Sequence, residues 1–144
     1  MVELIVGNKG KGKTIELLAK VNDEVINAMG NIVYLDKSNK HMYELNNKIR
    51  LINVRDYNIQ NRDEFLGFLL GIISQDNDLT SMYCDSFIKL ASIDENNIDI
   101  SVIENTIDKL AAISEKYNIN FILSLTLEDN MVTDNLKKYV VKAL

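Results

Sequence analysis

The stretch VELIVGNKGKGKTIELL, residues 2–18, decides the fold. Its apolar opening, residues 2–6, predicts a buried β-strand, and the amphipathic pattern after Gly12 predicts a helix to about Met29. The segment between them, residues 7–14, reads GNKGKGKT and fits G-x-x-x-x-G-K-[ST] at every position. Glycines there let backbone N–H groups turn inward without a Cβ in the way, and the start of a helix adds unpaired N–H donors. We therefore expect this loop to bind a phosphate chain.

In sequence and position the loop resembles the Walker A motif of P-loop NTPases. That resemblance implies that Lys13 reaches the β- and γ-phosphates of ATP as a catalytic residue, and that the Thr14 hydroxyl helps to hold Mg²⁺. The remaining positions are expected to surround the phosphates: Gly7, Asn8, Lys9, Gly10, Lys11 and Gly12. Lys9 and Lys11 occupy free positions of the pattern, so their side chains are either ordinary surface charge or extra phosphate contacts.

Short apolar runs alternate with helical patterns along the rest of the chain, which is typical of stacked βαβ units. Further strands are expected at 31–36, 49–54, 80–85 and 118–126, and helices at 38–47, 61–74, 85–91 and from 101 onward. Asn61 with Glu64, and Ser101 with Glu104, form capping-box patterns. The last residues, KYVVKAL, are a sixth strand or a terminal helix. We expect one three-layer α/β/α P-loop domain over residues 1–144.

The expected sheet is mostly parallel, has five or six strands, and contains the first strand in a central position. We further expect the strand at 119–125 to lie between the first strand and the strand ending at Asp85, which is the RecA-like order.

Two aspartates at the ends of predicted strands are candidates for the Mg²⁺ side of the site. Asp85 ends the run SMYCD and Asp36 ends the run IVYLD. The carboxyl ends of parallel strands form the edge where such sheets bind ligands. We assign the metal role to Asp85 and keep Asp36 as its rival. Either residue could instead be a helix N-cap.

The residue that would activate water is missing from its usual place. Many fast P-loop ATPases carry a glutamate directly after the Walker B aspartate, and here that position is Ser86. Asp36 or Glu128 would have to replace it, and Asp36 could equally accept a proton from the hydroxyl of a substrate, as in nucleoside kinases. Ser124, near the end of the strand 118–126, is expected to sense the γ-phosphate.

Arginine, histidine and cysteine are scarce, and we find no arginine-bearing lid of the kind that nucleotide kinases carry. Arg55 follows a strand end and is a candidate phosphate-binding or trans-acting finger, with a salt bridge to Asp56 or Asp63 as the alternative. His41, the sole histidine, is expected to be exposed. Cys84 is expected to be inert packing within a strand.

The composition restricts the class of protein. A net charge of −5 argues against a general nucleic-acid binder. The single cysteine excludes an internal disulfide, so we expect a reducing, cytoplasmic location. No apolar run approaches the ~20 residues of a membrane span, and the N-terminal run lacks the features of a signal peptide. The GTP-specificity pattern N-K-x-D is absent, which favours ATP.

The whole chain resembles small, standalone P-loop proteins of clostridial type, some of which are labelled twitching-motility PilT-like ATP-binding proteins. The stretches VELIVGNKGKGKT, IVYLDKSNKHMYEL and SMYCDSF carry the resemblance. It implies the P-loop fold and binding of ATP with Mg²⁺. The acidic Walker B pair and histidine-bearing boxes of pilus-retraction motors are absent, so it implies no motor role.

Two functions fit this sequence. The first is an ATP-binding module with slow or partner-stimulated ATPase activity, which signals its bound state to a protein partner of unknown identity. The alternative is a small phosphotransferase, like a nucleoside or nucleotide kinase, with an unknown acceptor. The missing lid favours the first.

Overall fold

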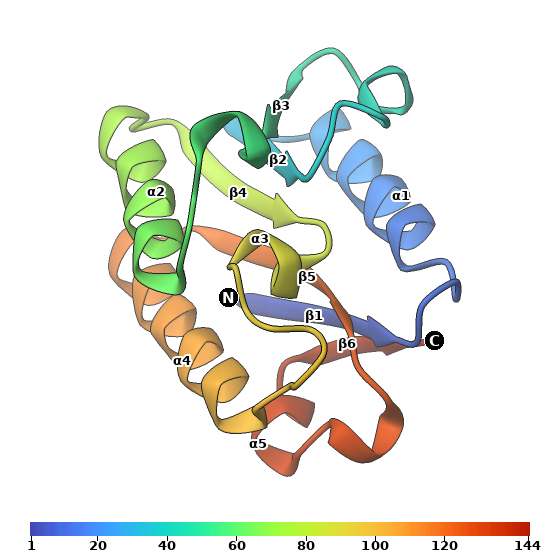
Figure 1. The fold of residues 1–144 in the computed structure, drawn as a ribbon. Coiled ribbons are helices and arrows are strands. Elements are labelled where there is room, and N and C mark those ends of the chain that lie inside the picture. The colour runs from blue at the N-terminus through green and yellow to red at the C-terminus, as the bar shows by residue number, and fades with distance from the viewer.

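A six-stranded parallel sheet lies at the centre of the computed structural model, which describes all 144 residues (Figure 1). The strands are β1 (Val2–Gly7), β2 (Asn31–Asp36), β3 (Ile49–Asn53), β4 (Leu79–Cys84), β5 (Asn120–Thr126) and β6 (Val140–Ala143). Their order across the sheet is β3-β2-β4-β5-β1-β6, and all neighbouring strands are parallel. β5 lies between β1 and β4, so the expected RecA-like order is confirmed. β1 has a neighbour on each side, and the C-terminal segment forms a sixth strand.

Helices cover the two faces of the sheet unequally (Figure 1). One face is covered by α1 (Lys13–Ile26), and the other by α2 (Arg62–Gln75) and α4 (Ile100–Tyr117) with the short α3 (Phe87–Leu90). The remaining helical turns are α5 (Asp134–Lys137) and the 3-10 turns η1 (Met42–Glu44), η2 (Val54–Tyr57) and η3 (Asp129–Met131). The expected α/β/α layering is therefore confirmed.

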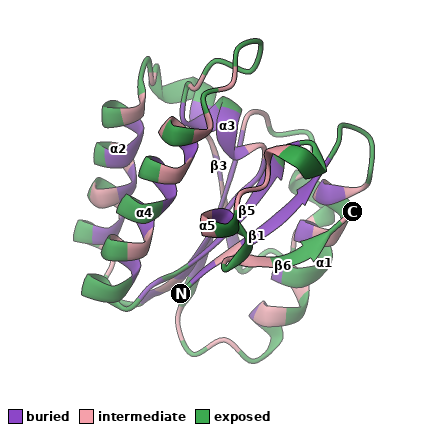
Figure 2. Cartoon of the chain, turned by 90° about the horizontal axis from the view of Figure 1, so that it is seen from below, coloured by how far each residue is buried: buried purple, intermediate pink, exposed green.

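Alternation along the strands divides the apolar side chains between two cores. In β1, Leu4 and Val6 face the larger core beneath α2 and α4, whereas Ile5 faces the smaller core beneath α1. Because both faces are covered, all three side chains are at most 3 % exposed. Figure 2 shows the same pattern over most of the chain, with buried residues along the inner strands and exposed residues on the outer sides of the helices, whereas the edge strand β6 is largely exposed. A sheet buried on both faces leaves its carboxyl edge as the place for polar chemistry.

The helix predicted at 38–47 is wrong. These residues form a loop with only the 3-10 turn η1. The Asn22 side chain donates to the carbonyl of Glu44 and accepts from the N–H of Asn46, both at 2.8 Å. These bonds take backbone groups that a helix would need, so the loop is held against α1 instead.

The N-cap predicted at Ser101 is also wrong. The cap is Asp99, two residues earlier, whose carboxylate accepts from both the N–H and the hydroxyl of Ser101, at 3.0 and 2.6 Å, and α4 begins at Ile100. The capping pattern at Asn61 is confirmed, since its side chain accepts from the N–H of Glu64 at 2.9 Å.

We expect Gly30→Ala to destabilise the fold, because a Cβ at this position would lie 2.1 Å from the Asp78 carbonyl oxygen and 2.6 Å from Thr80 Cγ2. Relieving that overlap would disturb the start of β2 against β4, at a cost of about 1–3 kcal/mol. Urea unfolding measures the change. The control is Gly67→Ala on the exposed side of α2, where a Cβ meets nothing within 4 Å, and a gain of roughly 0.5–1 kcal/mol is expected. An unchanged midpoint for Gly30→Ala would contradict the close packing described here.

Candidate functional site

The loop between β1 and α1 is an open backbone cradle. Gly10 and Gly12 have φ values of 83° and 92°, in the left-handed region that favours glycine. A Cβ at either position would meet nothing within 4 Å, so the glycines serve conformation and leave the loop interior free. The first helical bond of α1 joins the N–H of Glu16 to the carbonyl of Gly12 at 3.1 Å. The N–H groups between these residues therefore have no helical partner and could bind an anion.

The Lys13 ammonium folds back over this loop. Its Nζ donates to the Asn8 carbonyl oxygen at 2.8 Å, and the residue is only 8 % exposed. Burial lowers the pKa of Lys13, and the negative charge of Asp85 opposes that shift. A buried ammonium with one carbonyl partner retains two free donors, which suits it to oxygens of an entering anion.

Asp85 joins three elements at the carboxyl edge of the sheet. Its Oδ1 accepts from the hydroxyls of Thr14 in α1 and Ser124 in β5, at 3.2 and 2.7 Å, and its Oδ2 accepts from Tyr34 of β2 at 3.2 Å. The carboxylate is 3 % exposed. Ser124 Oγ also accepts from the N–H of Ser86 at 2.7 Å, which fixes the turn after β4. Sequence reasoning missed Tyr34, whose only signal was a hydroxyl-bearing residue within an otherwise aliphatic strand.

Asp36 lies at the end of β2 and is incompletely bonded. Its Oδ1 accepts from the N–H of Lys37 at 2.7 Å, whereas its Oδ2 is buried and has no hydrogen-bond partner. Burial raises the pKa of Asp36; the Lys37 N–H opposes the shift, and the nearby charge of Asp85 adds to it. One potential ligand atom from each of Asp36, His41 and Asp85 lies within 4.8 Å of the others.

A cavity of about 400 Å³ opens beside the loop. Its lining comes from the loop, the start of α1, the ends of β2, β4 and β5, and α3 with the segment after it: Lys9, Gly10, Gly12, Lys13, Thr14, Ile15, Lys37, Asp85, Ser86, Ile88, Lys89, Glu95, Ser124 and Thr126. The lining thus includes many of the expected phosphate- and metal-binding residues. Neither Asp36 nor Glu128 lines it; Asp36 lies near Asp85, and Glu128 is exposed before η3.

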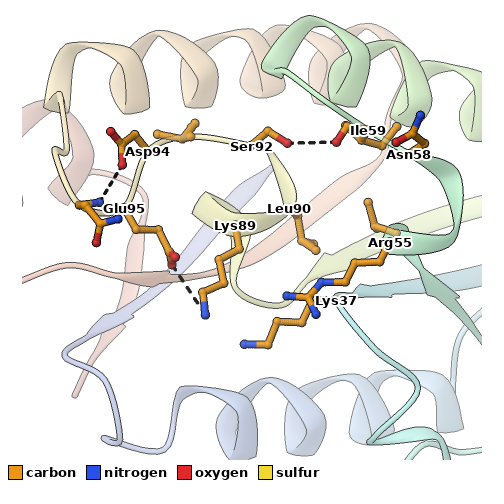
Figure 3. Close-up of a pocket in the computed structure, with 12 residues that line it drawn as sticks. Lys37, Arg55, Asn58, Ile59, Lys89, Leu90, Ser92, Asp94 and Glu95 are labelled. Carbon is orange, nitrogen blue, oxygen red and sulfur yellow. Dashed lines mark hydrogen bonds and ion pairs between the residues drawn. The ribbon is translucent and has the colours of Figure 1, made fainter.

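A second cavity, of about 710 Å³, adjoins the first and shares Lys37, Lys89 and Glu95 with it (Figure 3). Lys37, Arg55 and Lys89 come from three separate segments and extend into the same space. Lys89 reaches Glu95 at 3.9 Å, whereas neither Lys37 nor Arg55 has a carboxylate within 4.0 Å. Burial and the charge of Lys89 lower the pKa of Lys37. The expected alternative for Arg55, a salt bridge with Asp56 or Asp63, does not form.

The expected surroundings of Cys84 agree with the structure, whereas those expected for His41 do not. Cys84 is fully buried, and burial raises the pKa of its thiol, which agrees with inert packing. His41 was expected to be exposed, but only 21 % of its side chain is, and its Nδ1 pairs with Glu44 Oε2. Its place near Asp36 depends on the path of the 37–48 loop, for which the sequence carries no periodic signal.

Comparison with known proteins supports the fold. No protein-family model matches the chain, and no curated protein matches its sequence. Among solved structures, the chain is similar to the flagellar accessory protein FlaH from Methanocaldococcus jannaschii, with a TM-score of 0.58 and 12 % identity over 98 % of this chain and 70 % of that one. At this identity the likeness shows a shared three-layer, P-loop-type fold, and it gives no support to the clostridial PilT-like label. None of the helices has both the length and the apolar character needed to cross a bilayer.

We expect Asp36→Asn to raise stability at neutral pH, because it removes a buried charge with an unpartnered oxygen. A folded pKa above the ordinary value of 3.8 means that the native state holds its proton more tightly. The stabilisation by that proton is complete below pH 3.8 and is lost as pH rises through the folded pKa. The variant should therefore melt about 2–4 °C higher at pH 7, which corresponds to a gain of ~1 kcal/mol in the free energy of unfolding for a chain of this size. The gain should shrink toward pH 3.

The matched control is Asp85→Asn, which weakens an acceptor of three hydroxyl groups and should lower the melting temperature. Calorimetry across this pH range measures both variants. A neutral-pH loss of stability in Asp36→Asn would contradict the unpartnered state of its Oδ2.

Proposed function

We propose that this chain binds ATP with Mg²⁺ and acts as a nucleotide-dependent switch whose own hydrolysis is slow or depends on a partner. The observation that supports it most directly is the 3.2 Å contact between Thr14 Oγ1 and Asp85 Oδ1, next to the open glycine loop. This contact joins Thr14, which the Walker A resemblance assigns to Mg²⁺, to Asp85, the strand-end aspartate expected on the Mg²⁺ side. It also lies at the carboxyl edge of the parallel sheet, where ligands of such folds bind.

The loop residues would hold the phosphates. Free backbone N–H groups at the start of α1 would supply donors, Gly10 and Gly12 leave the loop interior open, and Lys13 would exchange the Asn8 carbonyl for phosphate oxygens. Ser124, already hydrogen-bonded to Asp85, would contact the γ-phosphate. Absence of the N-K-x-D pattern favours ATP over GTP.

Thr14 and Asp85 fit a magnesium ion. Hydroxyl and carboxylate oxygens are the donors that Mg²⁺ takes, usually from one or two side chains with phosphates and water completing the shell. The hydrogen bond between the two side chains shows that both oxygens reach one point. The bound ion would neutralise phosphate charge, and Asp85 would keep Thr14 and Ser124 oriented around it.

Hydrolysis would be slow because the usual residue for activating the attacking water is missing. Ser86 stands where a fast ATPase commonly has glutamate, and its N–H is tied to Ser124. Asp36, with an unpartnered oxygen near Asp85, is the favoured substitute base. Glu128 remains the second candidate, although it is exposed and outside the cavity. A partner could supply the missing group, as arginine fingers do in trans.

The second cavity favours one alternative, a phosphotransferase. Lys37, Arg55 and Lys89 offer positive charge beside the phosphate-binding cavity, which suits an anionic acceptor, and Asp36 could take the proton of its hydroxyl (Figure 3). A coupled assay with ATP, run with and without nucleosides and nucleotides, separates the two functions. ADP release that needs an added acceptor would favour the phosphotransferase.

We expect Lys13→Ala to reduce ATP affinity beyond detection by isothermal titration. Removing an ammonium that bonds charged oxygens costs about 1.5–3 kcal/mol per bond, and each 1.4 kcal/mol is roughly tenfold. Lys109→Ala, an exposed lysine on α4, is the control and should bind ATP as the native chain does. Native affinity in Lys13→Ala would contradict the proposed phosphate site.

Thr14→Ala tests the metal side separately. The hydroxyl is assigned to Mg²⁺, so the variant should lose ATP affinity in the presence of Mg²⁺ and little in EDTA, again by titration. Equal losses in both conditions would place the hydroxyl on the nucleotide instead.

We expect the isolated protein to hydrolyse Mg·ATP at ~1 s⁻¹ or well below, at the bottom of the usual enzyme range. A missing general base commonly costs ~10²–10⁴ in rate. If Asp36 positions the water, Asp36→Asn should lower the residual rate without weakening ATP binding, and Glu128→Gln is the parallel test. Phosphate release is the measurement, and tens of turnovers per second without a partner would contradict this proposal.

A further inference from the structure

Asp36, His41 and Asp85 bring one imidazole and two carboxylates together next to the proposed phosphate site. We propose that these three side chains form a second divalent-metal site, which binds a transition metal such as Mn²⁺ or Zn²⁺ without nucleotide. This site shares Asp85 with the proposed Mg²⁺ site, but its test needs no nucleotide because all three ligands come from the chain.

The spacing is close to that of a metal site. The three ligand atoms lie within 4.8 Å of one another, and both aspartates are at least nine-tenths buried. Two ligands on one ion, each at ~2.1 Å, lie at most about 4.2 Å apart. A small side-chain rotation therefore closes the set. The ligands come from the end of β2, the 37–48 loop and the residue after β4, so the fold brings them together.

The unpartnered oxygen of Asp36 is a second, independent observation that points to a bound cation. Its Oδ2 is buried without a hydrogen bond, while Oδ1 is already used by the N–H of Lys37. A buried polar atom without a partner costs free energy, and most such atoms in native proteins are satisfied. Asp85 Oδ2 accepts one hydrogen bond, from Tyr34 at 3.2 Å, so a lone pair of this oxygen is left for a cation.

Glu44 holds His41 in the way that a carboxylate commonly holds a metal-binding histidine. Its Oε2 pairs with His41 Nδ1, so Nε2 is the ring nitrogen left to bind a metal ion. A carboxylate on the far nitrogen is the usual companion of a metal-bound histidine. The loop that carries both residues is held to α1 by the two hydrogen bonds of Asn22.

The nearby lysines leave the two aspartates unpaired. Lys13 Nζ donates to the Asn8 carbonyl, and Lys37 Nζ lies 3.5 Å from Ser86 Oγ; neither is within 4.0 Å of a carboxylate. No ion pair therefore competes directly with a cation for either carboxylate. An imidazole with carboxylates suits Mn²⁺, Zn²⁺ or Fe²⁺, whereas Mg²⁺ and Ca²⁺ take oxygen ligands. His41 is thus the residue that separates this site from the Thr14–Asp85 site.

The test uses untagged, nucleotide-free protein titrated with Mn²⁺ and followed by the EPR signal of the free ion. We expect about one Mn²⁺ per chain, with ¹⁴N coupling from one imidazole in pulsed EPR. His41→Ala should abolish that coupling, and both His41→Ala and Asp36→Asn should weaken Mn²⁺ binding at least tenfold. Glu44→Gln should weaken it roughly tenfold, the lower end for the partner of a metal-bound histidine.

The control variant is Asp108→Asn, an exposed carboxylate on α4, which should bind Mn²⁺ like the native chain. Absence of Mn²⁺ binding would overturn the proposal. So would Mn²⁺ binding that is unchanged in His41→Ala, because the ion would then occupy oxygen ligands alone. Failure of ATP binding would overturn the proposed function and would leave this nucleotide-free result standing.

Discussion

The Asp85 carboxylate is the contact on which the candidate site depends. Three hydroxyl groups donate to it, from α1, β2 and β5, although these elements are separated along the chain. The carboxylate is 3 % exposed, so leaving any of its oxygens without a partner would be costly. The strand order makes the meeting possible, because β4 lies between β2 and β5. The same carboxylate thus joins the start of α1 to β2 and β5, and Ser124 links it in turn to the N–H of Ser86.

The site is uneven in a way that bears on function. The groups that the proposed phosphate site needs are present: an open glycine loop, a buried lysine and a hydroxyl–carboxylate pair. Its water-activating side has Ser86 in the usual glutamate position and a single unpartnered carboxylate oxygen on Asp36. Such an arrangement favours binding over turnover. In the proposed function, nucleotide binding would change the state of the protein, and a partner or a substrate would complete the reaction.

Much of the fold could be predicted because its signals are local. β2 occupies the residues expected, and the strand inserted between β1 and β4 is the one expected. The helix at 38–47 failed because Asn22, distant in sequence, binds the loop backbone. Asp85 was identifiable from its place after a buried strand. Tyr34 was missed and His41 was expected to be exposed, because their neighbours depend on strand order and loop path, which no periodicity encodes. The unpartnered state of Asp36 likewise exists only in three dimensions.

The most direct test of the central claim is a crystal structure with Mg²⁺ and a slowly hydrolysed ATP analogue. We expect the phosphates within the loop at residues 7–14, the ion beside Thr14 and Asp85, and the γ-phosphate facing Ser124. A nucleotide bound elsewhere, or a metal ion distant from Asp85, would contradict the claim that this carboxylate organises a Mg·ATP site.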